Sequence, residues 1–151
     1  KHIKRLRIHT RLPVVIPSRV DSQILDWLGN TRLKPTMVLH INHANEIDAK
    51  LCQAVDQLKT AGITMLNQSV LLKGVNDCSE QLIALSEKLF DAGIMPYYLH
   101  MLDPVQGASH FDIPKDRAIE IFSQMQAELP GFLLPKLVQE RAGETSKSLI
   151  L

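Results

Sequence analysis

Hydrogen-bonding and titratable side chains gather where four strand-like segments of this sequence end. They are Arg7, His9 and Arg11; His40, Asn42 and His43; Asn67 and Gln68; and Tyr98, His100 and Asp103. In parallel α/β folds, binding and catalysis take place at the carboxyl ends of the strands. One histidine in such a place is usually an imidazole satisfied at the edge of the core. Polar groups at four strand ends instead favour a shared site.

A lysine near the end of the sequence is a second chemical candidate. Lys147 follows a stretch of small and polar residues at 142–146. A loop of that kind can carry a lysine across the mouth of a barrel, where a desolvated amine can form a Schiff base. By spacing alone, however, such a loop is more often an ordinary surface loop.

Metal-assisted hydrolysis is the alternative chemistry. Its candidate ligands are His40 and His43, spaced as H-x-x-H, and His100 and Asp103, spaced as H-x-x-D, together with His110. Imidazole and carboxylate groups suit several divalent metals. No H-E-x-x-H or C-x-x-C pattern accompanies them, and His43 falls in a loop after the strand-end His40. The sequence therefore favours a site to which this chain contributes no metal ligand.

The elements that must position these residues alternate between strand and helix. Strands are predicted at 4–9, 36–41, 63–72 and 94–100, and the main helices at 22–29, 47–61, 79–92 and 115–129. The strands begin about 30 residues apart, the length of one βα unit, which implies parallel strands with right-handed crossovers. About four units are too few for a closed (β/α)8 barrel. A small open sheet or part of a barrel is expected.

Composition narrows the class of protein. Seventeen Lys and Arg against 16 Asp and Glu give a net charge of +1, which argues against a nucleic-acid-binding or membrane-surface protein. The two cysteines, Cys52 and Cys78, form no disulfide framework and fit a reducing compartment. No apolar run approaches the roughly 20 residues of a membrane span, and no signal peptide is recognised. We expect a cytoplasmic protein.

Several segments in order resemble the lysine 2,3-aminomutase family. They are RLRIHTRLPVVIPSR at 5–19, HINHANEI at 40–47, LNQSVLLKGVND at 66–77, PYYLHMLDPVQGASHF at 96–111 and GFLLPKL at 131–137, followed by SK at 146–147. The E-x-x-G-E-x-S-K ending at 140–147 is similar to the branch that makes (R)-β-lysine for attachment to elongation factor P.

This resemblance implies a radical rearrangement that depends on three cofactors. They are pyridoxal 5′-phosphate (PLP), S-adenosylmethionine (SAM) and a [4Fe–4S] cluster, which carry the chemistry while the protein orients and shields it. The implied reaction moves the amino group of L-lysine from carbon 2 to carbon 3. A functional link to elongation factor P and its ligase follows, as does a homo-oligomer at full length. The alternatives are a catabolic free-lysine aminomutase and, in another class, a non-catalytic α/β binding module.

Five residues receive roles from the resemblance. Lys147 matches the lysine that holds PLP as a Schiff base. Asp103 and Glu140 match the two carboxylates that bind the side-chain ammonium of the substrate, although the free-lysine enzymes have Asp at the position of Glu140. His40 and Gln68 match positions near SAM.

The cluster motif of the family, C-x-x-x-C-x-x-C, does not occur, because the two cysteines lie 26 positions apart. The motif needs three thiolates, so the resemblance implies that the cluster ligands lie upstream and that this piece alone does not turn over. The expected architecture is a partial (β/α) barrel of the radical SAM type over residues 1–130. An irregular segment at 131–151 carries the PLP lysine.

Overall fold

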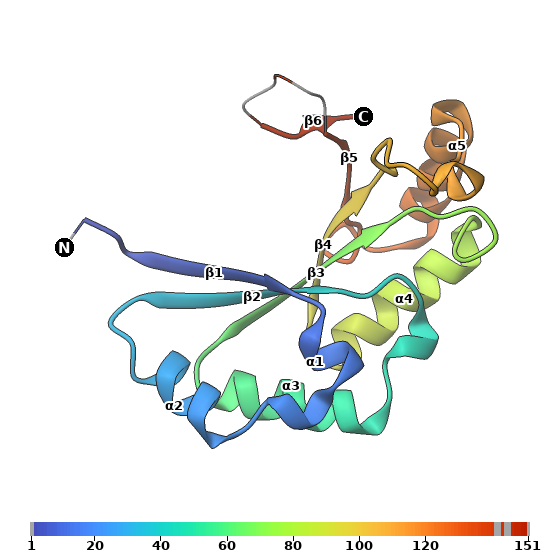
Figure 1. Ribbon diagram of the computed structural model, residues 1–151. Helices are drawn as coiled ribbons and strands as arrows, with labels where there is room; N and C mark the ends of the chain where they lie inside the picture. Colours follow the sequence, from blue (N-terminus) through green and yellow to red (C-terminus); the bar gives the residue numbers. More distant parts are fainter. Residues whose placement is uncertain (1, 141–142, 144–145, 151) are drawn as a thin grey trace.

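The sheet of the protein has strands in the same order as the chain. The computed structural model describes residues 2–140, 143 and 146–150. Its strands are β1 (Arg5–Thr10), β2 (Lys34–His40), β3 (Thr64–Val70), β4 (Met95–His100), β5 (Lys136–Gln139) and β6 (Ser148–Leu149). Strands β1 to β5 are parallel, and β6 runs antiparallel to β5. The alternation of strand and helix gives the expected partial barrel (Figure 1).

Helices pack against one face of this sheet. They are α1 (Leu12–Val15), α2 (Ser22–Gly29), α3 (Ala49–Thr60), α4 (Ser79–Asp91) and α5 (Lys115–Glu128), with short 3₁₀ turns at Pro17–Arg19, Ala44–Glu46 and Ser109–Phe111. The four predicted strands and four predicted helices are confirmed to within a few residues. The Pro-containing segment after β1 forms α1 and a 3₁₀ turn, because proline in the first turn of a helix is well tolerated.

Local signals account for most helix ends. Asp21 and Asp48 cap α2 and α3, accepting hydrogen bonds from the backbone N–H groups of Ile24 and Leu51. Such caps satisfy amides that have no partner inside the helix. Helix α4 begins without such a cap: Ser79 is its first residue, and Cys78 occupies the cap position without a side-chain hydrogen bond.

The segment after residue 130 differs from the sequence expectation of an irregular tail. Lys136–Gln139 adds β5 to the sheet beside β4, and Ser148–Leu149 returns antiparallel to it. Leu137 is buried in the cluster that joins α4 and α5 to the sheet. These strands are too short to have a recognisable period, so only their partners in the sheet define them.

The two faces of the sheet have different chemistry. Met37, Leu39 and Met65 are buried on the face that the helices cover. The residues between them point to the opposite face, because side chains alternate along a strand. His40 lies beside Gln68, and Gln68 beside Tyr98, in the strand register. The open face therefore collects polar side chains from neighbouring strands.

Gly93, which follows α4, has a backbone conformation that a substitution can test. Gly93 has φ +78°, and a Cβ built there would lie 2.0 Å from Lys59 Nζ. We expect Gly93→Ala to lower the free energy of unfolding by about 1–2 kcal/mol, because alanine disfavours positive φ. Urea denaturation measures the change. The matched control is Gly131→Ala, where no atom lies within 4 Å of the added Cβ; equal losses in both variants would contradict the argument.

Candidate functional site

Three buried polar atoms on the open face of the sheet make no hydrogen bond of normal geometry to any residue that the structure describes. They are His40 Nε2 at the end of β2, Gln68 Oε1 on β3 and His100 Nε2 at the end of β4. Buried polar groups almost always have a partner, and leaving one without a partner costs free energy. Three such atoms on successive strands therefore indicate a place where another molecule binds.

The histidines on this face favour the neutral form. Burial lowers the pKa of His100 to about 4, and the positive charge of Lys147 adds to this, while Glu140 and Asp103 oppose it. Burial is also the main cause of the lowered pKa values of His9 and His40. The Arg7 and Lys147 charges contribute at His9, whereas the Gln68 side chain acts in the opposite direction. Near neutral pH, the face thus presents neutral imidazoles.

Lys147 lies near the histidines of the open face. Its ammonium forms an ion pair with Glu140, and this contact lowers the pKa of the Glu140 carboxyl. Lys147 Nζ is 5.7 Å from the centroid of the Tyr98 ring. The pairing of Gln139 with Ser148 explains the meeting, because β6 returns beside β5 and brings residues 140 and 147 together. Residues 142, 144 and 145 of the predicted small-residue stretch lie outside the described part of the chain.

Asp103 stands at the rim of this group. It is exposed in the loop after β4, and its charge raises the pKa of His100. The loop borders a cavity of about 480 Å³ lined by Leu102, Asp103, Pro104, Val105, Ser109, Asp112 and Gln139. The fold therefore brings all five predicted residues to one end of the sheet: His40 beside Gln68, and Lys147 beside Glu140, with Asp103 at the edge.

His100 receives no role from the resemblance, and the sequence offered it only as a ligand of the alternative metal site. It appears among the strand-end polar residues, but nothing in the sequence distinguishes it from its neighbours. Its exposed fraction is 6%, and its ring lies 5.7 Å from that of Tyr98. The signal that singles it out is burial without a partner, which is a property of the folded chain.

Side-chain amides tie the strand ends together beneath this site. Asn67 accepts from the backbone N–H of Ile41 (2.9 Å) and donates to its carbonyl oxygen (3.0 Å). Asn76 accepts from Leu72 N (2.7 Å). It also donates to the carbonyl oxygens of Asn42 (2.8 Å) and Val70 (3.0 Å). These bonds fix the backbone next to His40 and Gln68.

The predicted alternative metal ligands are arranged for other purposes. His43 Nδ1 accepts from the backbone N–H of Asn45 (3.1 Å) and caps the Ala44–Glu46 turn. Within residues 2–140, 143 and 146–150, no three His, Cys, Asp or Glu side chains are grouped so as to hold a metal ion. The geometry therefore gives the metal-assisted alternative no support from these residues.

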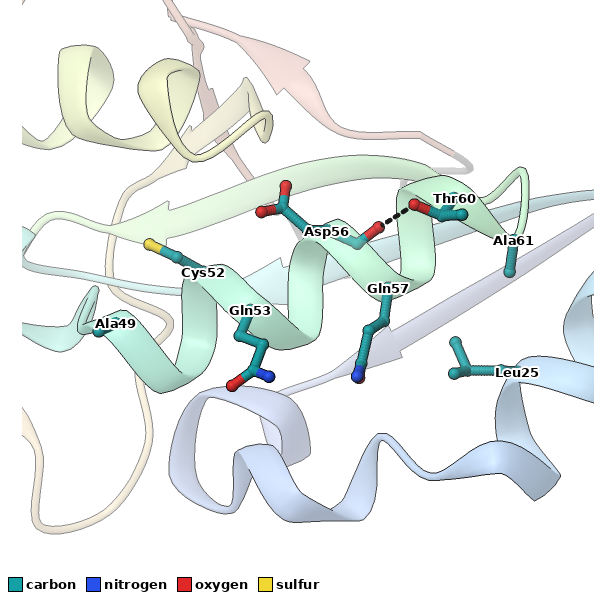
Figure 2. A pocket seen from close by; sticks show the side chains of 8 residues that line it. All are labelled: Leu25, Ala49, Cys52, Gln53, Asp56, Gln57, Thr60 and Ala61. Atoms are coloured by element: carbon teal, nitrogen blue, oxygen red, sulfur yellow. Dashed lines mark hydrogen bonds between the residues drawn. The ribbon is translucent and has the colours of Figure 1, made fainter.

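A larger cavity lies away from the polar face. It measures about 720 Å³ and is lined by Leu25, Ala49, Cys52, Gln53, Asp56, Gln57, Thr60 and Ala61. Figure 2 shows that these side chains come from α2, α3 and the turn after it, outside the sheet. No unpartnered buried polar atom lines it, so its size does not make it the chemical site.

None of the helices in the described ranges is long and apolar enough to cross a membrane.

The low pKa of His100 predicts how stability depends on pH. In the unfolded chain His100 takes up a proton below about pH 6.5, whereas the folded protein resists protonation until about pH 4. Its contribution is therefore fully present above pH 6.5 and is lost as the pH falls toward 4. We expect urea unfolding to show a smaller loss of stability between pH 7 and pH 5 in His100→Gln than in the parent. If His100→Gln and the parent lose the same stability between pH 7 and pH 5, His100 is not a buried, neutral imidazole in the folded protein.

Comparisons with known proteins identify relatives of the chain. No protein-family model matches it. It is 55% identical over 98% of its length to a protein named L-lysine 2,3-aminomutase from Haemophilus influenzae. It is 51% identical over 97% of its length to one of the same name from Escherichia coli. The chain spans about 44% of the length of the first relative and 43% of the second.

A solved structure is also similar. A radical SAM methyltransferase from Sphaerobacter thermophilus matches 90% of this chain with a TM-score of 0.63, and the match covers 40% of that protein. At 15% identity, the likeness concerns the fold alone, and it agrees with a partial barrel of the radical SAM type. The extended sequence identity to the two aminomutases carries the assignment further: the chain belongs to the lysine 2,3-aminomutase family.

Proposed function

We propose that this chain is part of an L-lysine 2,3-aminomutase, an isomerase that makes (R)-β-lysine for attachment to elongation factor P. The observation that carries the proposal is the polar open face, where Lys147 and Glu140 lie beside buried histidines without partners. The names of the relatives support the lysine substrate. The E-x-x-G-E-x-S-K ending at 140–147 supports the elongation-factor branch.

The residues of the open face fit PLP. Lys147 offers an amine, and the Tyr98 ring lies 5.7 Å from it as an aromatic neighbour. When bound, PLP carries the migrating amino group and delocalises the unpaired electron. Lys147 would hold it, with residues 131–151 as the segment that presents this lysine. Residues 1–130 would then form the barrel part.

The strand ends of β2 and β3 fit SAM. His40 Nε2 and Gln68 Oε1 are buried without a hydrogen bond of normal geometry within the described chain, and they could bond a ribose hydroxyl or an amino-acid group. A lowered pKa keeps His40 uncharged, so it does not repel the positively charged sulfonium of SAM. These two residues would bind and orient the cofactor.

The residues of the chain do not fit the [4Fe–4S] cluster. Cys52 lies on α3 and Cys78 at the start of α4, whereas the cluster of this enzyme class needs three thiolates together. Its ligands would come from the part of the relatives that this chain does not span. We therefore expect activity only from a protein that includes that part.

Asp103 and Glu140 would bind the side-chain ammonium of the substrate. An ammonium taken out of water needs carboxylate partners. Glu140 already holds an ammonium, that of Lys147, which is direct support for its ability to do so. With its amine held in a Schiff base, Lys147 would no longer present a free ammonium to Glu140, and Glu140 would be available for the substrate.

The cellular role is tested by complementation. The full-length gene is expressed in a strain that lacks its own aminomutase, and elongation factor P is analysed by mass spectrometry. We expect β-lysylated elongation factor P to reappear. The proposed location is the cytoplasm, and the proposed functional partner is the ligase that attaches β-lysine. If the protein forms β-lysine but the modification does not return, the catabolic alternative replaces the proposal.

A full-length protein without iron and labile sulfide would favour the binding module. Size-exclusion chromatography tests the expected homo-oligomer.

A further inference from the structure

His100 is held in the sheet by its backbone, while the Nε2 atom of its ring has no hydrogen-bond partner among the described residues. Its carbonyl oxygen accepts from Leu71 N (2.9 Å), and the next residue, Met101, donates its N–H to Val138 O (2.9 Å). These bonds prevent the end of β4 from moving away from its neighbours. The side chain is 6% exposed, and Nε2 has no hydrogen-bond partner within the described chain.

The strand neighbours of His100 offer no hydrogen bond to its Nε2 atom. At the level of His100, the register places Val70 on one side and Val138 on the other. Neither valine side chain offers a donor or an acceptor. A buried polar atom without a hydrogen bond costs free energy unless a bound molecule supplies the missing bond.

The charges that act on the ring indicate which part of the site it faces. Lys147 has the largest effect of any charge, followed by Glu140 and Asp103, and His40 contributes least. The Tyr98 ring is 5.7 Å from the ring of His100 and 5.7 Å from Lys147 Nζ. His100 is thus associated with the lysine side of the site more closely than with His40.

We propose that His100 is a further ligand-binding residue, whose Nε2 hydrogen-bonds the pyridoxal phosphate group held at Lys147. This inference rests on the proposed function, because it takes PLP at Lys147 as given. It assigns a role to a residue to which the resemblance gave none and which the sequence offered only as a ligand of the alternative metal site.

A ligand contact and a structural contact predict opposite effects of one substitution. His100→Leu replaces the unpartnered imidazole with an apolar side chain among valines. The cofactor-free protein should therefore be at least as stable as the parent. If the missing partner is PLP, the same variant should bind PLP about tenfold more weakly. A residue that only supports the fold would lose stability and PLP affinity together.

Two polar variants define the atom involved. Glutamine reaches about as far as histidine Nε2, whereas asparagine is shorter and reaches only the Nδ1 position. We expect His100→Gln to bind PLP within about threefold of the parent, and His100→Asn to resemble His100→Leu. This comparison also applies if His100→Leu fails to fold.

The experiment uses the full-length protein and needs no turnover. PLP affinity is measured from the absorbance of the bound chromophore, SAM affinity by calorimetry, and the stability of the cofactor-free protein by thermal melting. The proposal is overturned if His100→Leu and His100→Asn bind PLP as the parent does. It is equally overturned if these variants weaken SAM instead, since the contact would then lie on the His40 side.

Failure of the proposed function itself gives a different result. Borohydride reduction of the parent with PLP, followed by peptide mapping, shows which lysine carries the label. Labelling at Lys147 with unaffected His100 variants rejects only the role of His100. Absence of the label from Lys147 in the parent rejects the function and, with it, this inference.

Discussion

Replacing Lys147 with alanine in the full-length protein will abolish the covalent attachment of PLP and lower turnover by at least about a thousandfold. The amine is the only group of this residue that can form a Schiff base, and Glu140 holds it on the open face. Removing the exposed ion pair itself should cost less than about 1 kcal/mol of folding free energy. The variant should therefore fold normally.

Borohydride trapping and a turnover assay check this result, with Lys136→Ala as the control. Lys136 is an exposed lysine of β5 in the same sheet, so it tests whether any lysine near the site can take the label. We expect the control to retain the label and the activity. A Lys147→Ala protein that still traps PLP would show that another residue is the anchor.

Replacing Asn76 with alanine should lower the free energy of unfolding by about 3 kcal/mol. Asn76 is fully buried and makes three hydrogen bonds with backbone groups of Leu72, Asn42 and Val70. Alanine leaves those groups buried without their partners. Because the bonds join the loop after β2 to the end of β3, SAM affinity should also fall through the displacement of His40 and Gln68.

Asp77→Ala is the matched control in the same turn. Asp77 accepts one exposed hydrogen bond, from Gly74 N at 3.0 Å, and its loss should cost no more than about 1 kcal/mol. Chemical denaturation gives both values. If the two variants lose the same stability, the ties to Asn42 and Val70 contribute nothing, and the account of how these strand ends are fixed is wrong.

The sequence by itself determined the repeating βα architecture, because its signals are local. The caps Asp21 and Asp48 and the positive-φ glycines Gly62 and Gly93 stand where helices begin and end. Apolar periods of helix and strand locate the elements between them. The polar strand ends could be read in the same way, since parallel strands bring their carboxyl ends to one edge of the sheet.

The tertiary structure alone decided which side chains meet on the open face. A register shift opposite Asn67 and Gln68 pairs these residues with Pro96 and Tyr98, so that Tyr97 is an extra residue in β4. One extra residue reverses the face of every later side chain in a strand, and no local pattern reveals it. This shift turns His100 toward the site. Likewise, Lys147 meets Glu140 because β6 pairs with β5, and two strands this short have no period by which the sequence could reveal their pairing.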